Sequence, residues 1–445
     1  MTNKPMLLFQ GPVRSRSGYG DHTRDLILSL IEMDKFDVKI APTKWGDCPE
    51  TGLHGVANRG KIESRFLPSN RLDKQPDVYI MCSVPNEFQP VGKYNIGITA
   101  GIETTIADAS WIEGCNRMDL IIVPSKHSKD VFIQTVYDKM DDRSKKKIGE
   151  LKIEKPIDVL FEGADLDIFK QLSDDSIYPS IDSELKSIKE DFCFLYVGHW
   201  LDGKIGHDRK DTGMLIKTFC TAFAGDTTQP ALILKTSSAT FSILDRRQMY
   251  EKIQDIRADI DNAPNVYLLH GDLTPDEMNG LYNYSKVKAH ISFTKGEGFG
   301  RPLLEASISG KPVIASAWSG QLDFLHPDFT TLLPGDLKDV HRSAQWKGLI
   351  NEGSKWFYVN YAIAEKVMRD VYGNYDRYRV LANKQATHSI DNFSIAKMNT
   401  DFVTLINKHI SFKPAPSQVK LTLPKLKKLG KSSTPTLNLP KLKKI

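Results

Sequence analysis

Two consecutive series of short apolar segments constrain the fold of this chain more than any other feature. The strands expected in the first series are 6–10, 37–40, 77–82, 95–99 and 119–123. Those expected in the second are 192–197, 231–235, 266–270, 287–293 and 312–316. Stretches with helical periodicity separate them, such as 22–33, 211–223, 243–261 and 275–282. Such alternation predicts parallel sheets covered by helices on both faces.

Length and composition divide the chain into segments. At 445 residues it exceeds a single core of ordinary size, so two α/β domains are expected, at 1–170 and 191–390. Residues 171–190 are polar, with clusters of Ser and Asp, and indicate a linker. Residues 356–410 are expected to be largely helical, and 413–445 form a separate tail.

The tail is basic and contains an internal repeat. It carries nine lysines and no acid, so the chain's net charge of +5 leaves a net charge of −4 on the remaining residues. Leu421–Leu429 recurs as Leu437–Ile445, and its prolines and like charges predict a disordered arm. The lysines expected to bind nucleic acid or another partner are Lys425, Lys427, Lys428, Lys441, Lys443 and Lys444. Alternating leucine and lysine would also suit an anionic membrane surface.

Bulk composition argues against several protein classes. With 40% hydrophobic and 26% charged residues the chain has the composition of a soluble globular protein. No run approaches the roughly 18 apolar residues that span a bilayer, and the first residues lack a signal-peptide pattern. Its five cysteines are widely scattered, which argues against a disulfide framework or a zinc site. We therefore expect a cytoplasmic protein.

The segment Glu297–Glu305 joins two acids through a glycine-rich turn. Ala289–Phe293 before it has the pattern of a buried strand, and Pro302 suits the first turn of a helix. Glu297 is therefore expected on a strand-to-helix loop and Glu305 in the first turns of that helix. The free backbone N–H groups at such a helix end suit a phosphate. An acid on the loop can hold sugar hydroxyls.

This segment resembles the Glu-x7-Glu signature of retaining glycosyltransferases of family 4, and the resemblance extends over roughly residues 6–410. It implies the GT-B architecture, two Rossmann-like domains facing a cleft, with a last helix at 391–412 crossing back to the first domain. It also implies that Glu297 binds hydroxyls of the transferred sugar and Glu305 the ribose of the nucleotide. The other donor-binding residues it implies here are Gly298, Phe299, Gly300 and Leu303.

A basic loop follows the first strand of the second domain. The family has a strand ending in Val-Gly-Arg there and a lysine opening the next helix, and the two cations neutralise the leaving diphosphate in place of a metal. Lys210 matches the lysine, His199 stands at the arginine position, and Arg209 can substitute for the arginine. Lys235 and Gly271 match further donor-site positions. We expect no metal or cofactor, and Asp141-Asp142 suggests a solvated helix end rather than a metal-binding motif.

The first domain offers fewer candidates. A glycine-rich loop at 11–21 follows the first strand, and its Gly18 and Gly20 permit close backbone approach to a diphosphate or an acceptor. It does not match the G-x-G-x-x-G word of nicotinamide-binding proteins. Glu103 resembles a family position that faces the cleft. No histidine stands in Thr99–Thr105, so no acceptor-side base is assigned.

The resemblance implies hexosyl or pentosyl transfer from a nucleoside diphosphate sugar, such as a UDP-sugar, with retention at the anomeric carbon. Short motifs such as Ser17–His22 and Val84–Phe88 resemble motifs of glycosyltransferases encoded by large tailed bacteriophages. Some of these modify hydroxymethylated bases in DNA, and a lysine-rich tail would attract DNA phosphates. A hydroxymethylated pyrimidine in double-stranded phage DNA is therefore the favoured acceptor. Two alternatives stay open: a surface glycan, lipid or protein acceptor, and a GT-B protein that binds nucleotide or DNA without transfer.

Overall fold

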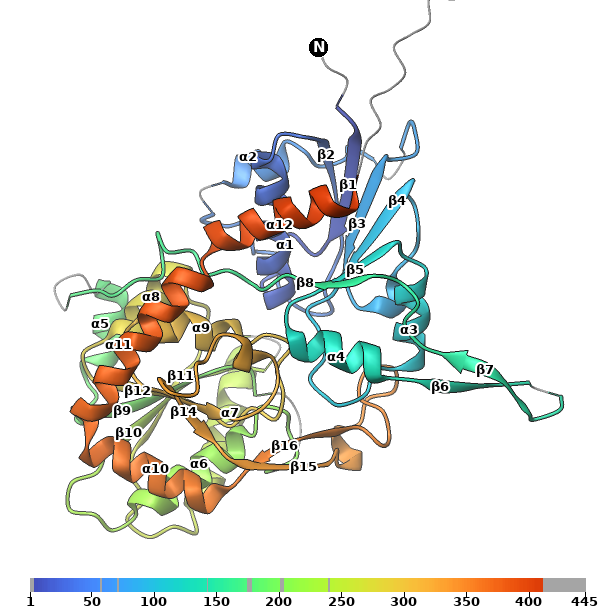
Figure 1. Ribbon diagram of the computed structural model, residues 1–445. Helices are drawn as coiled ribbons and strands as arrows, with labels where there is room; N and C mark the ends of the chain where they lie inside the picture. Colours follow the sequence, from blue (N-terminus) through green and yellow to red (C-terminus); the bar gives the residue numbers. More distant parts are fainter. Residues whose placement is uncertain are drawn as a thin grey trace, which may run out of the picture. The chain divides into compact units, whose positions relative to one another are not determined.

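The first sheet contains six parallel strands in the order β2-β1-β3-β4-β5-β8 (Figure 1). The computed structural model describes residues 4–56, 58–69, 72–141, 143–173, 178–200, 204–238 and 241–410. The strands of this sheet are β1 (Met6–Gly11), β2 (Asp37–Pro42), β3 (Val78–Cys82), β4 (Tyr94–Ile98), β5 (Leu120–Val123) and β8 (Ile157–Val159). The five strands expected from the sequence are present, and β8 is additional.

The second sheet also has six parallel strands, in the order β11-β10-β9-β12-β13-β14. They are β9 (Cys193–Val197), β10 (Ala231–Lys235), β11 (Val266–Leu269), β12 (Val287–Ser292), β13 (Val313–Ser316) and β14 (Thr331–Leu333). The strand order reverses between β9 and β12, and ligands of open α/β sheets bind beyond the carboxyl ends of the strands at such a point. The fold class expected from the sequence, two doubly wound α/β domains, is confirmed.

Helices lie between the strands of both sheets, and others follow the last strand. They are α1 (Gly18–Glu32), α2 (Arg59–Glu63), α3 (Ala109–Asn116), α4 (Lys126–Gln134), α5 (Pro179–Leu185), α6 (Thr212–Phe223), α7 (Ile243–Arg257), α8 (Pro275–Asn283), α9 (Arg301–Ile308), α10 (Tyr361–Gly373), α11 (Tyr375–Asn392) and α12 (Ile395–His409). Helix α1 begins four residues before the expected start because the side chain of Ser17 caps it, accepting from the backbone N–H of Gly20. No helix in these described ranges is long and apolar enough to cross a membrane.

The second sheet is buried on both faces. Alternate residues of its strands, such as Phe194 and Ile291, pack against α6, α7 and α10 on one face. Their neighbours, such as Leu195, pack against α5, α8 and α9 on the other. This two-sided burial explains why the strands are continuous apolar runs in the sequence. In the first sheet, α3 and α4 cover one face.

Two antiparallel hairpins were not expected from the sequence. One joins β6 (Tyr137–Met140) to β7 (Lys147–Leu151), and the other joins β15 (Gly335–Asp339) to β16 (Lys355–Val359). Residues 356–359 are therefore a strand, so the prediction of a largely helical segment from 356 was wrong at its start. Asp141 lies in the β6–β7 turn, where its backbone N–H donates to the carbonyl of Lys146, and not at a helix end; Asp142 lies outside the described residues.

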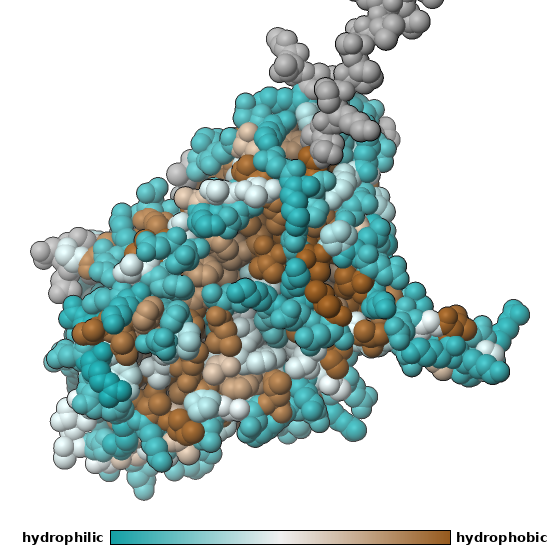
Figure 2. All heavy atoms as spheres, viewed as in Figure 1, coloured by the Kyte–Doolittle hydropathy of each residue, from teal (hydrophilic) through white to brown (hydrophobic). Residues whose placement is uncertain are grey.

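The surface of the β6–β7 hairpin is partly apolar. Figure 2 shows hydrophobic side chains on this projecting arm. Met140 and Ile148 of the hairpin are 51% and 68% exposed. The β15–β16 hairpin instead contacts the first domain, since the N–H of Thr105 donates to the carbonyl of Lys355 at 3.0 Å. The side-chain amide of Asn351 also donates to Asp108 at 2.6 Å.

The chain crosses between the two domains at two segments, and these segments lie side by side. The N–H of Ala164 donates to the carbonyl of Phe393 at 2.9 Å, and the N–H of Ile395 donates to the carbonyl of Ala164 at 2.8 Å. Helix α12 then packs against α1 of the first domain (Figure 1). The domain boundaries at 170, 190, 390 and 412 stay predictions, and the tail at 413–445 lies outside the described residues.

Replacing Gly163 by alanine tests this crossing. A Cβ at Gly163 would lie 2.5 Å from Cα of Ile395, so the two segments would have to separate. We expect Gly163→Ala to lower the free energy of unfolding by about 1–3 kcal/mol, measured by urea denaturation. The matched control is Gly149→Ala on β7, where an added Cβ meets nothing within 4 Å. Equal stability of the two variants would contradict the close approach.

Candidate functional site

The carboxylate of Glu297 is held between two cations at the carboxyl end of β12. It forms an ion pair with Lys210 and a second one with Nη1 of Arg209, at 3.2 Å. The hydroxyl of Thr294 donates to it at 2.7 Å. Its backbone N–H donates to the hydroxyl of Ser319 at 2.9 Å, which fixes the loop that carries it. The structure thus brings together Glu297, Lys210 and Arg209, the three residues expected to bind the sugar and to neutralise the leaving diphosphate in catalysis.

This environment keeps Glu297 ionised. Burial alone would raise the pKa of Glu297, but Lys210 and Arg209 outweigh it and lower the pKa to about 2. At neutral pH the group is a hydrogen-bond acceptor and a weak base. It can accept from hydroxyl groups, and it cannot donate a proton as a general acid.

A buried lysine missed by the sequence analysis shapes the loop that carries Arg209 and Lys210. Lys295 is fully buried, and its ammonium donates to the carbonyl of Gly206 at 2.6 Å and to the carbonyl of Asp208 at 2.9 Å. The backbone N–H of Lys295 also donates to the carbonyl of Arg209 at 2.8 Å. Residues 206–209 are therefore fastened to the strand-to-helix loop that carries Glu297.

Asp211 neutralises Lys295. The two charges are 3.0 Å apart, and neither side chain is exposed. Asp211 has a left-handed backbone, with φ of 53°, and accepts from the hydroxyl of Tyr361 at 2.6 Å. The rings of Trp356 and Tyr358 on β16 complete the enclosure, with centroids 5.2 and 4.4 Å from the ammonium.

Glu305 has a different environment from Glu297. It accepts from Nε of Arg301 at 3.0 Å and from the hydroxyl of Tyr282 at 3.4 Å. Burial raises the pKa of Glu305 to about 7, and Arg301 only partly offsets this. Arg301 also donates to Asp25 of α1 at 2.6 Å, which links the site to the first domain. Burial raises the pKa of the neighbouring Glu162 to about 8.

The remaining donor-side candidates lie around the same strand ends. Nδ1 of His199 lies 3.0 Å from the carbonyl oxygen of Ser238, so the backbone engages this nitrogen. The pKa of His199 is lowered, by burial first and then by Lys210. Lys235 donates to the carbonyl of Gly271 at 2.5 Å, and burial lowers the pKa of Lys235 to about 8.

Two of the candidate donor-binding side chains in the segment Glu297–Glu305 are buried in the protein core. Phe299 and Leu303 belong to the core of the second domain, 2% and 8% exposed. Their side chains therefore pack instead of facing solvent, and donor contact by Phe299 or Leu303 stays a prediction. Gly300 precedes α9 with φ of 98°, a conformation that favours glycine. A Cβ on Gly298 would lie 1.9 Å from the carbonyl oxygen of Ala100, so a glycine lets the two domains touch here.

Gly18 and Gly20 lie in the first turn of α1, and not in a loop as expected. A Cβ on Gly20 would lie 2.2 Å from the carbonyl oxygen of Ser15, so this glycine permits the loop to fold onto its own helix. A Cβ on Gly18 meets nothing within 4 Å. Glu103 does lie near the site, 3.8 Å from Nη1 of Arg209. Contact of these three residues with a ligand stays a prediction.

Across the part of the chain that the structure describes, no group of three or more His, Cys, Asp or Glu side chains could hold a metal ion. The expectation that no metal or cofactor is needed stays a prediction. The cations available to an anionic ligand near Glu297 are those of Arg209 and Lys210.

Part of the second domain matches a known protein family. Residues 231–347 match the family model described as "Glycosyl transferases group 1", and this range includes Glu297 and Glu305. None of the curated proteins matches the sequence of this chain.

Solved structures establish the fold. Sucrose-phosphate synthase from Thermosynechococcus elongatus is 14% identical with a TM-score of 0.58, covering 91% of this chain and 98% of its own. Anabaena HepE in complex with UDP-glucose is 13% identical with a TM-score of 0.54, covering 91% and 100%. A glycosyltransferase from Rickettsia africae is 13% identical with a TM-score of 0.58, covering 92% and 99%. The two Rossmann-like domains match GT-B structures, and the expected GT-B fold is confirmed.

The Lys295–Asp211 pair can be tested by a double-mutant cycle. Lys295→Met leaves the carboxylate of Asp211 buried without its counter-charge, so we expect a loss of about 3–5 kcal/mol of unfolding free energy. Asp211→Asn in the same chain removes that charge, so the double variant should lose less than the two single variants combined. Urea denaturation measures all four proteins. Strict additivity would contradict a direct interaction between the two residues.

Proposed function

We propose that this chain is a retaining glycosyltransferase that moves a sugar from a nucleoside diphosphate sugar to a hydroxyl group. The observation that carries the proposal is the ionised Glu297 between Arg209 and Lys210, at the point where the strand order of the second sheet reverses. The match of residues 231–347 to the group 1 glycosyl transferase model supports it. So does the likeness in fold to a protein solved with UDP-glucose.

The cations account for stabilisation of the leaving group. In transfer, the bond between the anomeric carbon and the diphosphate oxygen breaks, and negative charge grows on that oxygen. Arg209 and Lys210 are preorganised cations of the kind that stabilise such charge. Before the donor binds, the carboxylate of Glu297 partly neutralises Arg209 and Lys210. Once the donor binds, hydroxyls of its sugar would donate to that carboxylate.

The weak basicity of Glu297 bears on the stereochemistry. A carboxylate with a pKa of about 2 is a poor acceptor for the proton of the attacking hydroxyl. In the front-face reaction that we favour, the leaving phosphate oxygen takes that proton while the acceptor oxygen bonds to the same face of the anomeric carbon. Retention follows, and no side chain has to act as the base.

For the acceptor we propose a hydroxymethylated pyrimidine in double-stranded DNA. Its support is the lysine-rich segment 413–445, which lies outside the described residues and would contact DNA phosphates without reading sequence. Glycan, lipid or protein acceptors are the alternative, and binding of nucleotide or DNA without transfer is a second one.

Two substitutions test the catalytic assignment. Lys210→Ala removes a cation from the leaving group, so kcat should fall by about 10²–10³-fold, and Glu297→Gln should abolish transfer. The matched control is Lys217→Ala, an exposed lysine on α6 that should keep full activity. Circular dichroism checks that each variant is folded. Full activity in the Lys210 or Glu297 variant would refute the assignment.

The pKa of Glu305 gives a pH test of the ribose contact. Because burial raises this pKa to about 7, Glu305 is neutral below pH 7 and becomes a carboxylate as the pH rises through 7. Ribose hydroxyls donate better to the carboxylate, so affinity for the nucleoside diphosphate should rise across that range. Calorimetric titration from pH 5.5 to 8.5 measures it. Glu305→Gln should bind more weakly and show a smaller rise, and equal pH profiles in the two proteins would exclude the contact.

A mass-spectrometric assay identifies the acceptor. UDP-, GDP- and ADP-sugars would be offered with DNA containing hydroxymethylated or plain pyrimidines. We expect a mass gain on the hydroxymethylated base only, lost when Lys413–Ile445 are deleted at physiological salt. Donor hydrolysis without a gain on DNA would move the acceptor to a glycan, lipid or protein. No turnover of any donor would support binding without transfer.

A further inference from the structure

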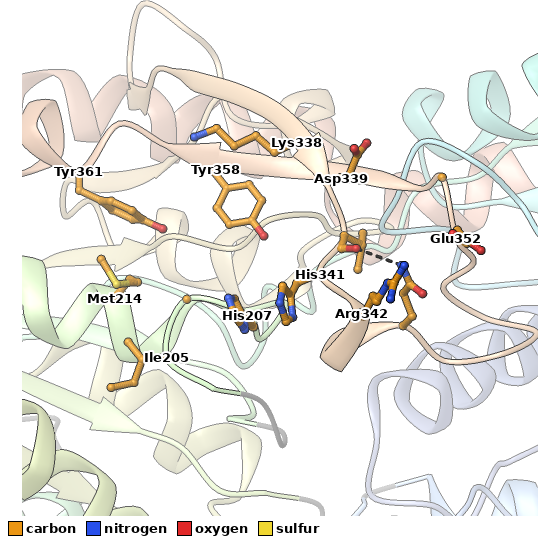
Figure 3. A pocket seen from close by; sticks show the side chains of 14 residues that line it. Ile205, His207, Met214, Lys338, Asp339, His341, Arg342, Glu352, Tyr358 and Tyr361 are labelled. Atoms are coloured by element: carbon orange, nitrogen blue, oxygen red, sulfur yellow. Dashed lines mark hydrogen bonds between the residues drawn. The ribbon is translucent and has the colours of Figure 1, made fainter.

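A cavity of about 890 Å³ lies beside the loop that carries Arg209 and Lys210, and the residues that line it are not used by the proposed reaction (Figure 3). One wall is the segment Ile205–His207 with Met214 of α6, and the other is the β15–β16 hairpin with the residues between its strands. Arg209 and Lys210, a few residues further along the same loop, contact Glu297 instead. The cavity is within the size range of small-molecule sites.

Two histidines form a stacked pair in this cavity. The rings of His207 and His341 are 3.7 Å apart between centroids and inclined by 17°. The backbone N–H of Ser343 donates to Nδ1 of His341 at 3.2 Å. Because Nδ1 is an acceptor, the neutral ring carries its proton on Nε2, and the described residues supply no hydrogen-bond acceptor for that N–H. His341 is thus oriented as a donor.

The lining also carries cations without acidic partners among the described residues. Arg342 forms no ion pair there, and the ammonium of Lys338 lies only over the ring of Tyr358, at 5.6 Å. The lining contains two acids, Asp339 and Glu352. Asp339 lies 3.9 Å from Lys355, so Glu352 is the acid that remains to offset the charge of these cations. Burial and then the nearby His341 lower the pKa of His207, and Asp208 offsets this only in part.

We propose that this cavity binds a phosphate-bearing small molecule, at a site separate from that of the sugar donor. The oxygens of such a ligand are acceptors, and the lining offers them the fork of Arg342 and Nε2 of His341 on one side and the ammonium of Lys338 on the other. Tyr358 and Met214 offer apolar surface to the rest of the ligand. This binding site does not depend on the proposed function.

The test follows the imidazole NMR signals of His207 and His341 while a probe is added, with the signals assigned through the variants His207→Gln and His341→Gln. The probes are glucose 6-phosphate and inorganic pyrophosphate, titrated separately. We expect saturable shifts of both signals with at least one probe. Shifts with pyrophosphate would show that the phosphoryl group suffices, and shifts with glucose 6-phosphate alone would show that the sugar contributes. Unmoved signals with both at millimolar concentration would overturn the proposal.

A matched pair of variants localises the binding. Arg342→Gln removes a lining cation, whereas Lys347→Gln removes an exposed cation on the same segment that does not line the cavity. The dissociation constant should rise at least tenfold in the first and less than twofold in the second, with equal melting temperatures. Equal dissociation constants in both variants would overturn the proposal. Because no transfer is measured, failure of the proposed function leaves this result unaffected.

Discussion

The buried ion pair between Lys295 and Asp211 is the interaction on which the arrangement of the site depends. A lysine with no exposed surface is stable in a protein only when its charge is compensated, and here one carboxylate and two backbone carbonyls do so. Those same contacts fix the loop between β9 and α6. The loop then presents Arg209 and Lys210 to Glu297, two residues after Lys295. An interaction inside the protein therefore determines the positions of the two cations that we propose for binding the diphosphate.

The carboxyl groups of Glu297 and Glu305 belong to one short segment, but their surroundings give them very different pKa values. Glu297 faces two cations and has a pKa of about 2, whereas burial raises the pKa of Glu305 to about 7, and Arg301, which also pairs with Asp25, offsets this only in part. The first suits a permanently ionised acceptor for sugar hydroxyls, and the second a group whose charge changes near neutral pH. Contacts between the domains, such as Arg301 with Asp25, are thus part of the electrostatics of the site.

Much of the fold could be predicted because buried parallel strands are apolar throughout, and the Glu297–Glu305 segment could be recognised because its spacing is specific. The β6–β7 hairpin could not, since its strands are largely exposed and carry no apolar alternation. Lys295 was missed because a single lysine in a sequence is usually a surface charge, and only the fold shows its burial. The role of Gly20 in packing against Ser15 depends on a contact that sequence spacing does not reveal.

The most direct measurement is a crystal structure of the chain with the nucleoside diphosphate, among UDP, GDP and ADP, that raises its melting temperature most. The account predicts that the diphosphate contacts Arg209 and Lys210, that the ribose lies against Glu305, and that Glu297 borders the space for the sugar. It also predicts that Lys295 and Asp211 remain paired and unmoved. A nucleotide bound away from Arg209 and Lys210, or a loop rearranged with the Lys295–Asp211 pair broken, would contradict the account.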